Sequence, residues 1–218
     1  MLRRLGVFGS TGALLASAFV AVATLGMSAA QAASFQDWVT VSAGYADTCG
    51  VRNNGKLYCW GRDNEGQIGD GDATGAIAPR RIGSFEDWDT VVAGDTHTCG
   101  IRHGGKLYCW GRDDNGQVGD GGELEASILA PRRVGDFEDW ATVSTGSSHT
   151  CGVRRNGKLY CWGYDFDGQI GNGAAGPLRV DAPKRIGSFD DWDTVVGGDA
   201  QTCGIRHGGK LYCWGFDA

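Results

Sequence analysis

Residues 48–61 read TCGVRNNGKLYCWG, and near-copies of this stretch occupy residues 98–111, 150–163 and 202–215. In each copy, two short runs of apolar and aromatic residues flank a turn that ends in glycine, a pattern typical of a β-hairpin. A tryptophan opens each repeat some ten residues earlier, at Trp38, Trp88, Trp140 and Trp192. The chain is therefore a tandem repeat array.

The first three repeats continue beyond the hairpin into a glycine-rich turn, G-Q-(I/V)-G-(D/N)-G, and then into a strand expected to start at proline, over residues 79–83, 131–135 and 183–187. The mature region has no helical period, so about four strands per repeat are expected, which corresponds to one propeller blade. We predict an all-β, β-propeller-type repeat array, a partial propeller or a fragment, whose last repeat is incomplete. The four repeats span residues of about 36–85, 86–137, 138–189 and 190–218.

The hairpin turn decides how the cysteines face each other. Glycine is the third turn residue, as at Gly55, which suits a three-residue loop with a left-handed last residue and places Cys49 opposite Cys59. A two-residue turn would instead place Cys49 opposite Trp60 and put the thiols on opposite faces, so the first register is preferred. A zinc site is disfavoured because close cysteine pairs are missing. The predicted disulfides are Cys49–Cys59, Cys99–Cys109, Cys151–Cys161 and Cys203–Cys213.

Residues 1–33 are predicted to be a signal peptide, because a basic start precedes an uncharged apolar run and a small-x-small site. An uncleaved membrane anchor and a twin-arginine signal are the alternatives. An even number of cysteines, eight, fits an oxidising compartment. The expected location is therefore secreted, or the periplasm and cell envelope, with membrane attachment only if the leader stays uncleaved.

The amino-acid composition argues against some classes of function. Glycine accounts for 38 of 218 residues, which indicates many turns, and a hydrophobic content of 41% supports a packed core. The formal net charge of −6 has the wrong sign for a protein that binds phosphate backbones. A nucleic-acid partner is therefore not expected.

These repeats resemble those of the regulator of chromosome condensation family, through the strings H-T-C-G-(V/I)-R, G-K-L-Y-C-W-G and G-Q-(I/V)-G-D-G and the strand that follows. The resemblance implies a β-propeller, usually of seven blades, that serves as a protein-binding platform. Cysteines paired within the hairpin are similar to those of exported bacterial members, so the nucleotide exchange of the nuclear member is not carried over. The chain has four copies, whereas the family usually has seven blades. The four blades can form an open arc, a four-bladed ring or half of a ring completed by a second chain, or the chain is a fragmentary gene product. Open blade edges predict self-association.

Candidate binding residues lie where the four copies differ, because positions fixed by the fold should look alike. One patch precedes the first cysteine of each hairpin, and we expect it on a loop at one rim. A second replaces Arg62 and Arg112 by Tyr164 and Phe216, and a third comprises the inserted segments 72–78, 122–130 and 174–182. Random drift of exposed loops is the alternative. The predicted contact residues are Tyr45, Asp47, Asp95, His97, His149, Tyr164 and Phe166.

Catalysis, metals and cofactors are not expected. The histidines fall at scaffold positions that assemble no nucleophilic triad. Acidic residues beside the glycine turns miss the EF-hand spacing, so solvated turns are favoured over calcium loops. The G-Q-I-G-D-G string precedes no helix that could hold a phosphate. The sequence thus predicts a non-enzymatic protein-binding module, with a self-assembling envelope protein or a hydrolase using loop carboxylates as alternatives.

Overall fold

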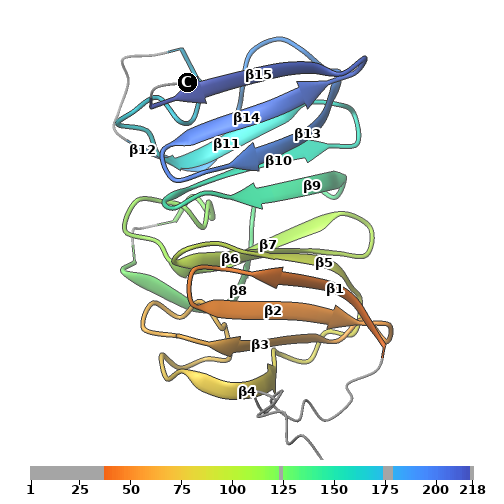
Figure 1. Ribbon diagram of the computed structural model, residues 1–218, viewed down its shortest axis with the longest axis vertical. Helices are drawn as coiled ribbons and strands as arrows, with labels where there is room; N and C mark the ends of the chain where they lie inside the picture. Colours follow the sequence, from red (N-terminus) through yellow and green to blue (C-terminus); the bar gives the residue numbers. More distant parts are fainter. Residues whose placement is uncertain (1–36, 123–124, 174–178, 217–218) are drawn as a thin grey trace, which may run out of the picture. The chain divides into compact units, whose positions relative to one another are not determined.

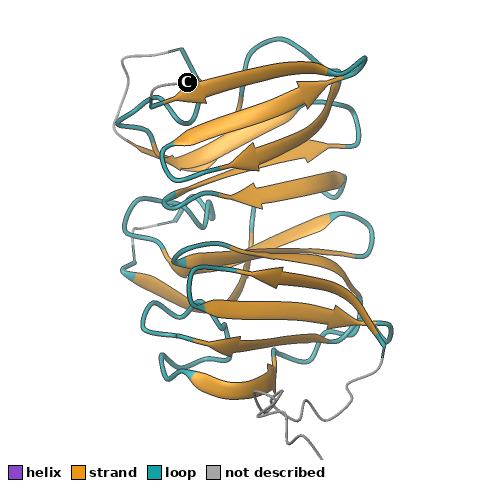
Figure 2. Ribbon diagram, in the orientation of Figure 1, coloured by secondary structure: helices purple, strands orange, loops and turns teal. Residues whose placement is uncertain are grey.

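The computed structural model describes residues 37–122, 125–173 and 179–216. All described residues belong to one compact unit. The predicted signal peptide therefore lies outside the described residues. Every regular element in the described ranges is a strand (Figure 2). Within them there is no helix of the length and apolarity needed to cross a membrane.

Each repeat folds into one antiparallel sheet whose strands are neighbours in sequence order (Figure 1). Blade 1 contains β1 (Trp38–Ala43), β2 (Asp47–Arg52), β3 (Leu57–Gly61) and β4 (Ala76–Arg81). Blade 2 contains β5 (Trp88–Ala93), β6 (His97–Arg102), β7 (Lys106–Arg112) and β8 (Ser127–Arg133). Blade 3 contains β9 (Trp140–Thr145), β10 (His149–Arg154), β11 (Leu159–Tyr164) and β12 (Arg179–Arg185). Blade 4 contains β13 (Trp192–Gly197), β14 (Gln201–Arg206) and β15 (Lys210–Gly215). The prediction of an all-β array with an incomplete last blade is confirmed.

The hairpin register is the one that the glycine turn predicts. In blade 1, Cys49 pairs with Cys59 and Gly50 with Tyr58, while Gly55 has a φ of 71°. Gly50 also makes room for the first tryptophan, because a Cβ there would lie 2.8 Å from the Trp38 ring. The four predicted bridges form, each between cysteines ten residues apart: Cys49–Cys59, Cys99–Cys109, Cys151–Cys161 and Cys203–Cys213.

The outer strands differ from the prediction, because they run across the prolines and do not start at them. In blade 1, β4 begins at Ala76, three residues before Pro79. Its pairing with β3 is irregular here, with Gly61 opposite Ala76 and Cys59 opposite Arg80. Proline lacks an N–H and is tolerated at such an irregularity in an edge strand. The ends of the segments 72–78, 122–130 and 174–182 thus belong to strands.

The glycine-rich turn joins each blade to the next. The main-chain oxygen of Gln67 accepts hydrogen bonds from Thr98 Oγ1 and Trp110 Nε1 of blade 2, both at 2.9 Å. A Cβ on Gly69 would lie 2.4 Å from that indole nitrogen, so only glycine fits. We call this arrangement the blade junction. It recurs twice, with Gln117 bonded to Thr150 and Trp162, and Gln169 bonded to Thr202 and Trp214.

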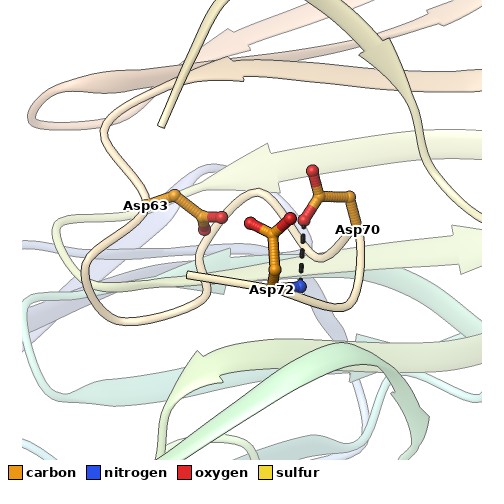
Figure 3. Close-up of side chains that lie close together, drawn as sticks. All are labelled: Asp63, Asp70 and Asp72. Carbon is orange, nitrogen blue, oxygen red and sulfur yellow. Dashed lines mark hydrogen bonds between the residues drawn. The ribbon is translucent and has the colours of Figure 1, made fainter. Parts of the chain in front are cut away.

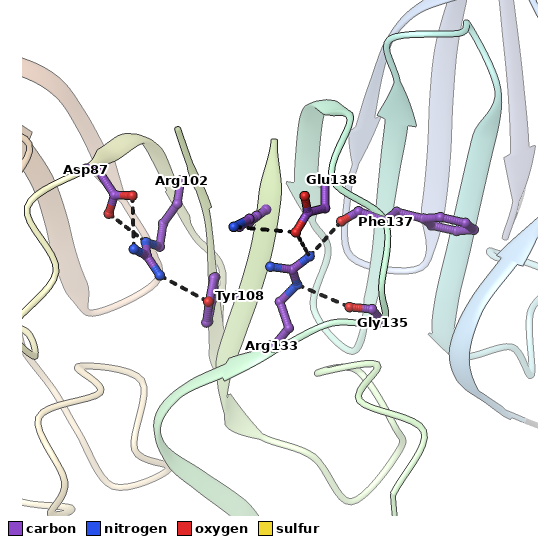
Figure 4. A network of polar contacts seen from close by, with 8 residues as sticks. Asp87, Arg102, Tyr108, Arg133, Gly135, Phe137 and Glu138 are labelled. Atoms are coloured by element: carbon purple, nitrogen blue, oxygen red, sulfur yellow. Dashed lines mark hydrogen bonds and ion pairs between the residues drawn. The ribbon is translucent and has the colours of Figure 1, made fainter. Parts of the chain in front are cut away.

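A polar network lies at the end of the strands that carries the hairpin turns (Figure 4). Arg102 forms two hydrogen bonds with Asp87, of 2.7 and 2.9 Å, and a third with the Tyr108 hydroxyl. Arg133 donates to the main-chain oxygens of Gly135 and Phe137. Partly exposed ion pairs add little stability individually, so their main effect is to hold the loop that leads into each blade.

A variable rim as the candidate functional site

The loops that connect the first two strands of each blade form a continuous edge. This edge lies at the end of the strands opposite the hairpin turns. Tyr45 N donates to Gly94 O at 3.3 Å, which joins the loops of blades 1 and 2. Thr96 Oγ1 donates to Ser147 O, and Ser147 N donates to Gly198 O, each at 3.2 Å. These contacts continue the edge through blades 3 and 4.

A second variable position adjoins this edge on every blade, at the end of the third strand or directly after it. In blade 3 the Tyr164 N–H donates to Ser148 O at 2.9 Å, and in blade 4 the Phe216 N–H donates to Ala200 O at 2.9 Å. Two patches that are separate in the sequence are therefore one surface. We call it the variable rim, and it comprises residues 44–46, 94–96, 146–148 and 198–200 together with Arg62, Arg112, Tyr164, Phe166 and Phe216.

At the end of the third strand, the rim carries arginine in blades 1 and 2 and an aromatic residue in blades 3 and 4. Arg62 is exposed, and Arg112 is paired with Asp114. In blades 3 and 4, Phe166 and Phe216 are 65% and 61% exposed, and Tyr164 stacks on Phe166 with ring centroids 6.3 Å apart. Tyr45, at the far end of the rim, is 76% exposed. Exposed aromatic residues next to polar ones are enriched at protein interfaces.

The structure places His97 and His149 differently from the expected rim loop. Both are fully buried inside strands, and each reaches the following blade: Nε2 lies 2.8 Å from the hydroxyl of Thr150 or Thr202. Each hydroxyl already donates to a glutamine carbonyl of a blade junction, so it accepts here and the histidine is protonated on Nε2. Burial lowers the pKa of His97 to about 3 and that of His149 to about 4. Both are therefore neutral residues of the blade junctions.

The other predicted contact residues differ in how exposed their side chains are. Asp95 is exposed on the rim, whereas Asp47 occupies the place of His97 in blade 1 and is only 3% exposed. Both carboxylate oxygens of Asp47 lack a hydrogen-bond partner among the described residues, and burial raises the pKa of Asp47 to about 7. The part of the predicted site that a partner could touch is thus Tyr45, Asp95, Tyr164 and Phe166.

An aspartate accepts a hydrogen bond from each glycine-rich turn. The sequence favours solvated turn residues at these positions, but Asp63 and Asp113 are buried and Asp165 is half-buried. Asp63 Oδ1 accepts a hydrogen bond from Ile68 N at 2.8 Å, and Asp113 and Asp165 bond in the same way to Val118 and Ile170. Burial raises the pKa of Asp63 to about 6 and that of Asp113 to about 7. The available signal was recurrence, because the string D-x-x-G-Q appears in all three complete repeats.

The repeats match a known family. The profile of the regulator of chromosome condensation (RCC1) repeat matches residues 38–67, 88–117 and 140–169, and a second profile of the same repeat matches residues 54–101 and 104–153. The ultraviolet-B receptor UVR8 of Arabidopsis thaliana is 31% identical over 179 residues, which are 81% of this chain and 41% of that protein.

Solved structures show the same fold. Yeast RCC1 (Prp20), in its complex with Kap60, superposes with a TM-score of 0.73 at 21% identity, over 82% of this chain and 44% of that one. Human WBSCR16 also gives a TM-score of 0.73, at 18% identity, over 84% of this chain and 48% of that one. The chain spans less than half the length of these relatives. From its repeats and its fold, it belongs to the regulator of chromosome condensation repeat family.

Proposed function

We propose that this chain is an exported, non-catalytic protein-binding module that contacts its partner through the variable rim. The observation that carries the proposal is the aromatic part of the rim in blades 3 and 4, where Tyr164, Phe166 and Phe216 stand exposed or half-exposed on an otherwise repetitive scaffold. Hydrogen bonds between neighbouring loops hold the rim in place. Loops ordered in advance lose less conformational entropy on binding, so more of the contact energy contributes to affinity.

The relatives support a binding role. Yeast RCC1 is described in a complex with Kap60, and Prp20p from Saccharomyces cerevisiae is described by its binding to Gsp1p and histones. Those partners belong to those proteins, and the present chain needs a different one if it is exported. Four disulfides favour an oxidising compartment, which supports export through residues 1–33.

The placement of the histidines supports a non-catalytic role. His97 and His149 are buried in the blade junctions and have no exposed surface. His103 and His207 belong to hairpin turns, at the end of the strands opposite the rim. The net charge of −6 supports a protein partner over a nucleic acid.

Affinity capture with matched variants tests the rim. The mature chain, with its disulfides formed, is immobilised and exposed to secreted and envelope proteins of its source. The double variant Tyr164→Ala with Phe166→Ala should lose at least about tenfold of the captured partner, since central aromatic residues commonly dominate interface energies. Ile77→Ala removes an exposed apolar side chain from β4, outside the rim, and should capture as much as wild type. Equal capture by both variants would exclude the rim.

Self-association is the second candidate, favoured by the uncovered last blade. Leu211 on β15 is 65% exposed, whereas Leu57, Leu107 and Leu159 at the same strand position are fully buried. If copies assemble through this face, Leu211→Lys should convert an oligomer into a monomer, as measured by light scattering. A wild-type chain that is monomeric at working concentration would reject this candidate and leave the rim proposal untouched.

A further inference from the structure

Asp63 is a buried carboxylate whose two oxygens differ in their hydrogen bonding. The residue is 0% exposed, and its Oδ1 is bonded to Ile68 N. Oδ2 is buried and has no hydrogen-bond partner among the described residues. A buried carboxylate oxygen without a partner is costly, so such an atom requires an explanation.

Two more carboxylates lie close to the Asp63 side chain (Figure 3). Asp70 and Asp72 follow on the glycine-rich turn of blade 1, and one oxygen from each of the three aspartates lies within 4.8 Å of the other two. Protein donors hold these side chains in place: Asp72 N bonds to Asp70 Oδ1 at 3.2 Å, and Thr74 N bonds to Asp72 Oδ1 at 2.7 Å. The three carboxylates are therefore gathered by the fold rather than by a chance approach of flexible side chains.

In the other blades, the corresponding aspartate has fewer acidic side chains beside it at the positions of Asp70 and Asp72. In blade 3, Asn172 occupies the position of Asp70, and its amide donates to Asp165 Oδ2 at 2.8 Å. In blade 2, Asp120 keeps the first carboxylate, but Gly122 replaces the second, at the position of Asp72. Within the described ranges, only blade 1 brings three potential ligands of this kind together.

We propose that Asp63, Asp70 and Asp72 bind one calcium ion beneath the glycine-rich turn of blade 1. Three carboxylates carry three negative charges, and Arg80, which contacts Asp70 and lies 3.6 Å from Asp72, supplies one positive charge. The remaining charge of about −2 matches a divalent cation. The expectation of no metal, which relied on the missing EF-hand spacing, is thereby revised for this blade.

Calcium fits this site better than magnesium for two reasons. It accepts six to eight oxygen ligands at about 2.3–2.6 Å in flexible geometry, so carboxylates up to about 5 Å apart can share one ion. Magnesium requires near-octahedral geometry at about 2.0–2.1 Å. Each carboxylate oxygen has two lone pairs, so Asp70 and Asp72 can bind the ion and keep their present donors. Water would complete the shell on the exposed side of Asp72.

Isothermal titration of the purified mature chain with CaCl₂, at constant ionic strength, tests the site. Wild type should bind one ion per chain with a Kd of roughly 10⁻⁴–10⁻³ M, the range of extracellular modules. Asp70→Asn, which copies blade 3, should weaken binding at least about tenfold. Asp120→Asn makes the same substitution in blade 2 and should stay within about twofold of wild type, since blade 2 lacks the third carboxylate.

A second readout separates loss of binding from loss of folding. Calcium should raise the melting temperature of wild type and Asp120→Asn but not that of Asp70→Asn. If Asp70→Asn does not fold, Asp72→Gly, which copies blade 2, replaces it with the same expectation. The proposal is overturned if wild type binds no calcium, if the blade 1 variants bind as wild type does, or if magnesium binds with equal affinity.

Discussion

Replacing His97 by glutamine should change how the stability of the protein depends on pH. His97 is fully buried, and burial together with the nearby His149 lowers its pKa from 6.5 to about 3. Below about pH 6.5, the unfolded chain therefore binds a proton at this histidine, whereas the folded chain does not. The contribution of His97 to the free energy of unfolding is present above that pH and is lost as the pH falls. Glutamine is a suitable replacement, because Gln201 occupies the same position in blade 4.

The size of the effect follows from the depressed pKa. Over about 1.5 pH units, from 6.5 to 5, linkage costs the wild type roughly 2 kcal/mol at ~1.36 kcal/mol per unit. The variant has no such group, so the stability difference between wild type and His97→Gln should move by about 2 kcal/mol in favour of the variant between about pH 7.5 and pH 5. Buried Asp47 and Asp113, whose pKa values are raised, act in the opposite direction, and the difference between the two proteins removes their contribution.

Guanidinium chloride unfolding, followed by tryptophan fluorescence with the disulfides intact, measures this difference. His103→Gln, at an exposed hairpin turn, is the matched control for loss of a histidine. A stability difference for His97→Gln that stays constant to within about 0.5 kcal/mol across this pH range would refute the assignment of a buried neutral histidine at the blade junction.

Two further predictions concern the scaffold. Replacing Cys151 and Cys161 together by serine should lower the free energy of unfolding by about 2.5–3 kcal/mol, because the bridge closes a short loop in the unfolded chain; an unchanged denaturation midpoint would contradict this. Gly119→Ala should cost about 1–3 kcal/mol more than Gly135→Ala, measured in the same way, although both glycines have positive φ. A Cβ at Gly119 would lie 2.2 Å from Trp162 Nε1, whereas one at Gly135 would meet nothing within 4 Å, so equal costs would argue against the blade junction.

The strands and disulfides could be predicted because they depend on local chemistry. A glycine at the third turn residue fixes the loop length, and the two-residue period of a strand then places Cys49 opposite Cys59. The outer strands could not be bounded in the same way. Pro79 indicates an interruption of the ladder, but only the pairing with β3 shows that the strand continues on both sides of it.

The blade junctions were missed because their acceptors are main-chain atoms. The carbonyl oxygen of Gln67 has no signature in the residue type, so only three-dimensional proximity shows that Trp110 donates to it. The burial of His97 was accessible, since two-residue alternation puts it on the same face as Cys99, which the disulfide prediction already placed inside. Variation among the copies indicates exposure only in part, because the position of His97 is buried in blade 1 as well, where it is occupied by Asp47.

All four disulfides lie within hairpins, and none joins one blade to another; the contacts between neighbouring blades are hydrogen bonds, packing and ion pairs. Thermodynamically, this makes the protein a linear series of units coupled to their nearest neighbours. Heating the protein, or pulling on one of its ends, should detach a terminal blade first. The hairpin of that blade stays cross-linked by its own disulfide. A weakened contact midway along the series would split the melting transition in two, with each half keeping its cross-linked loops.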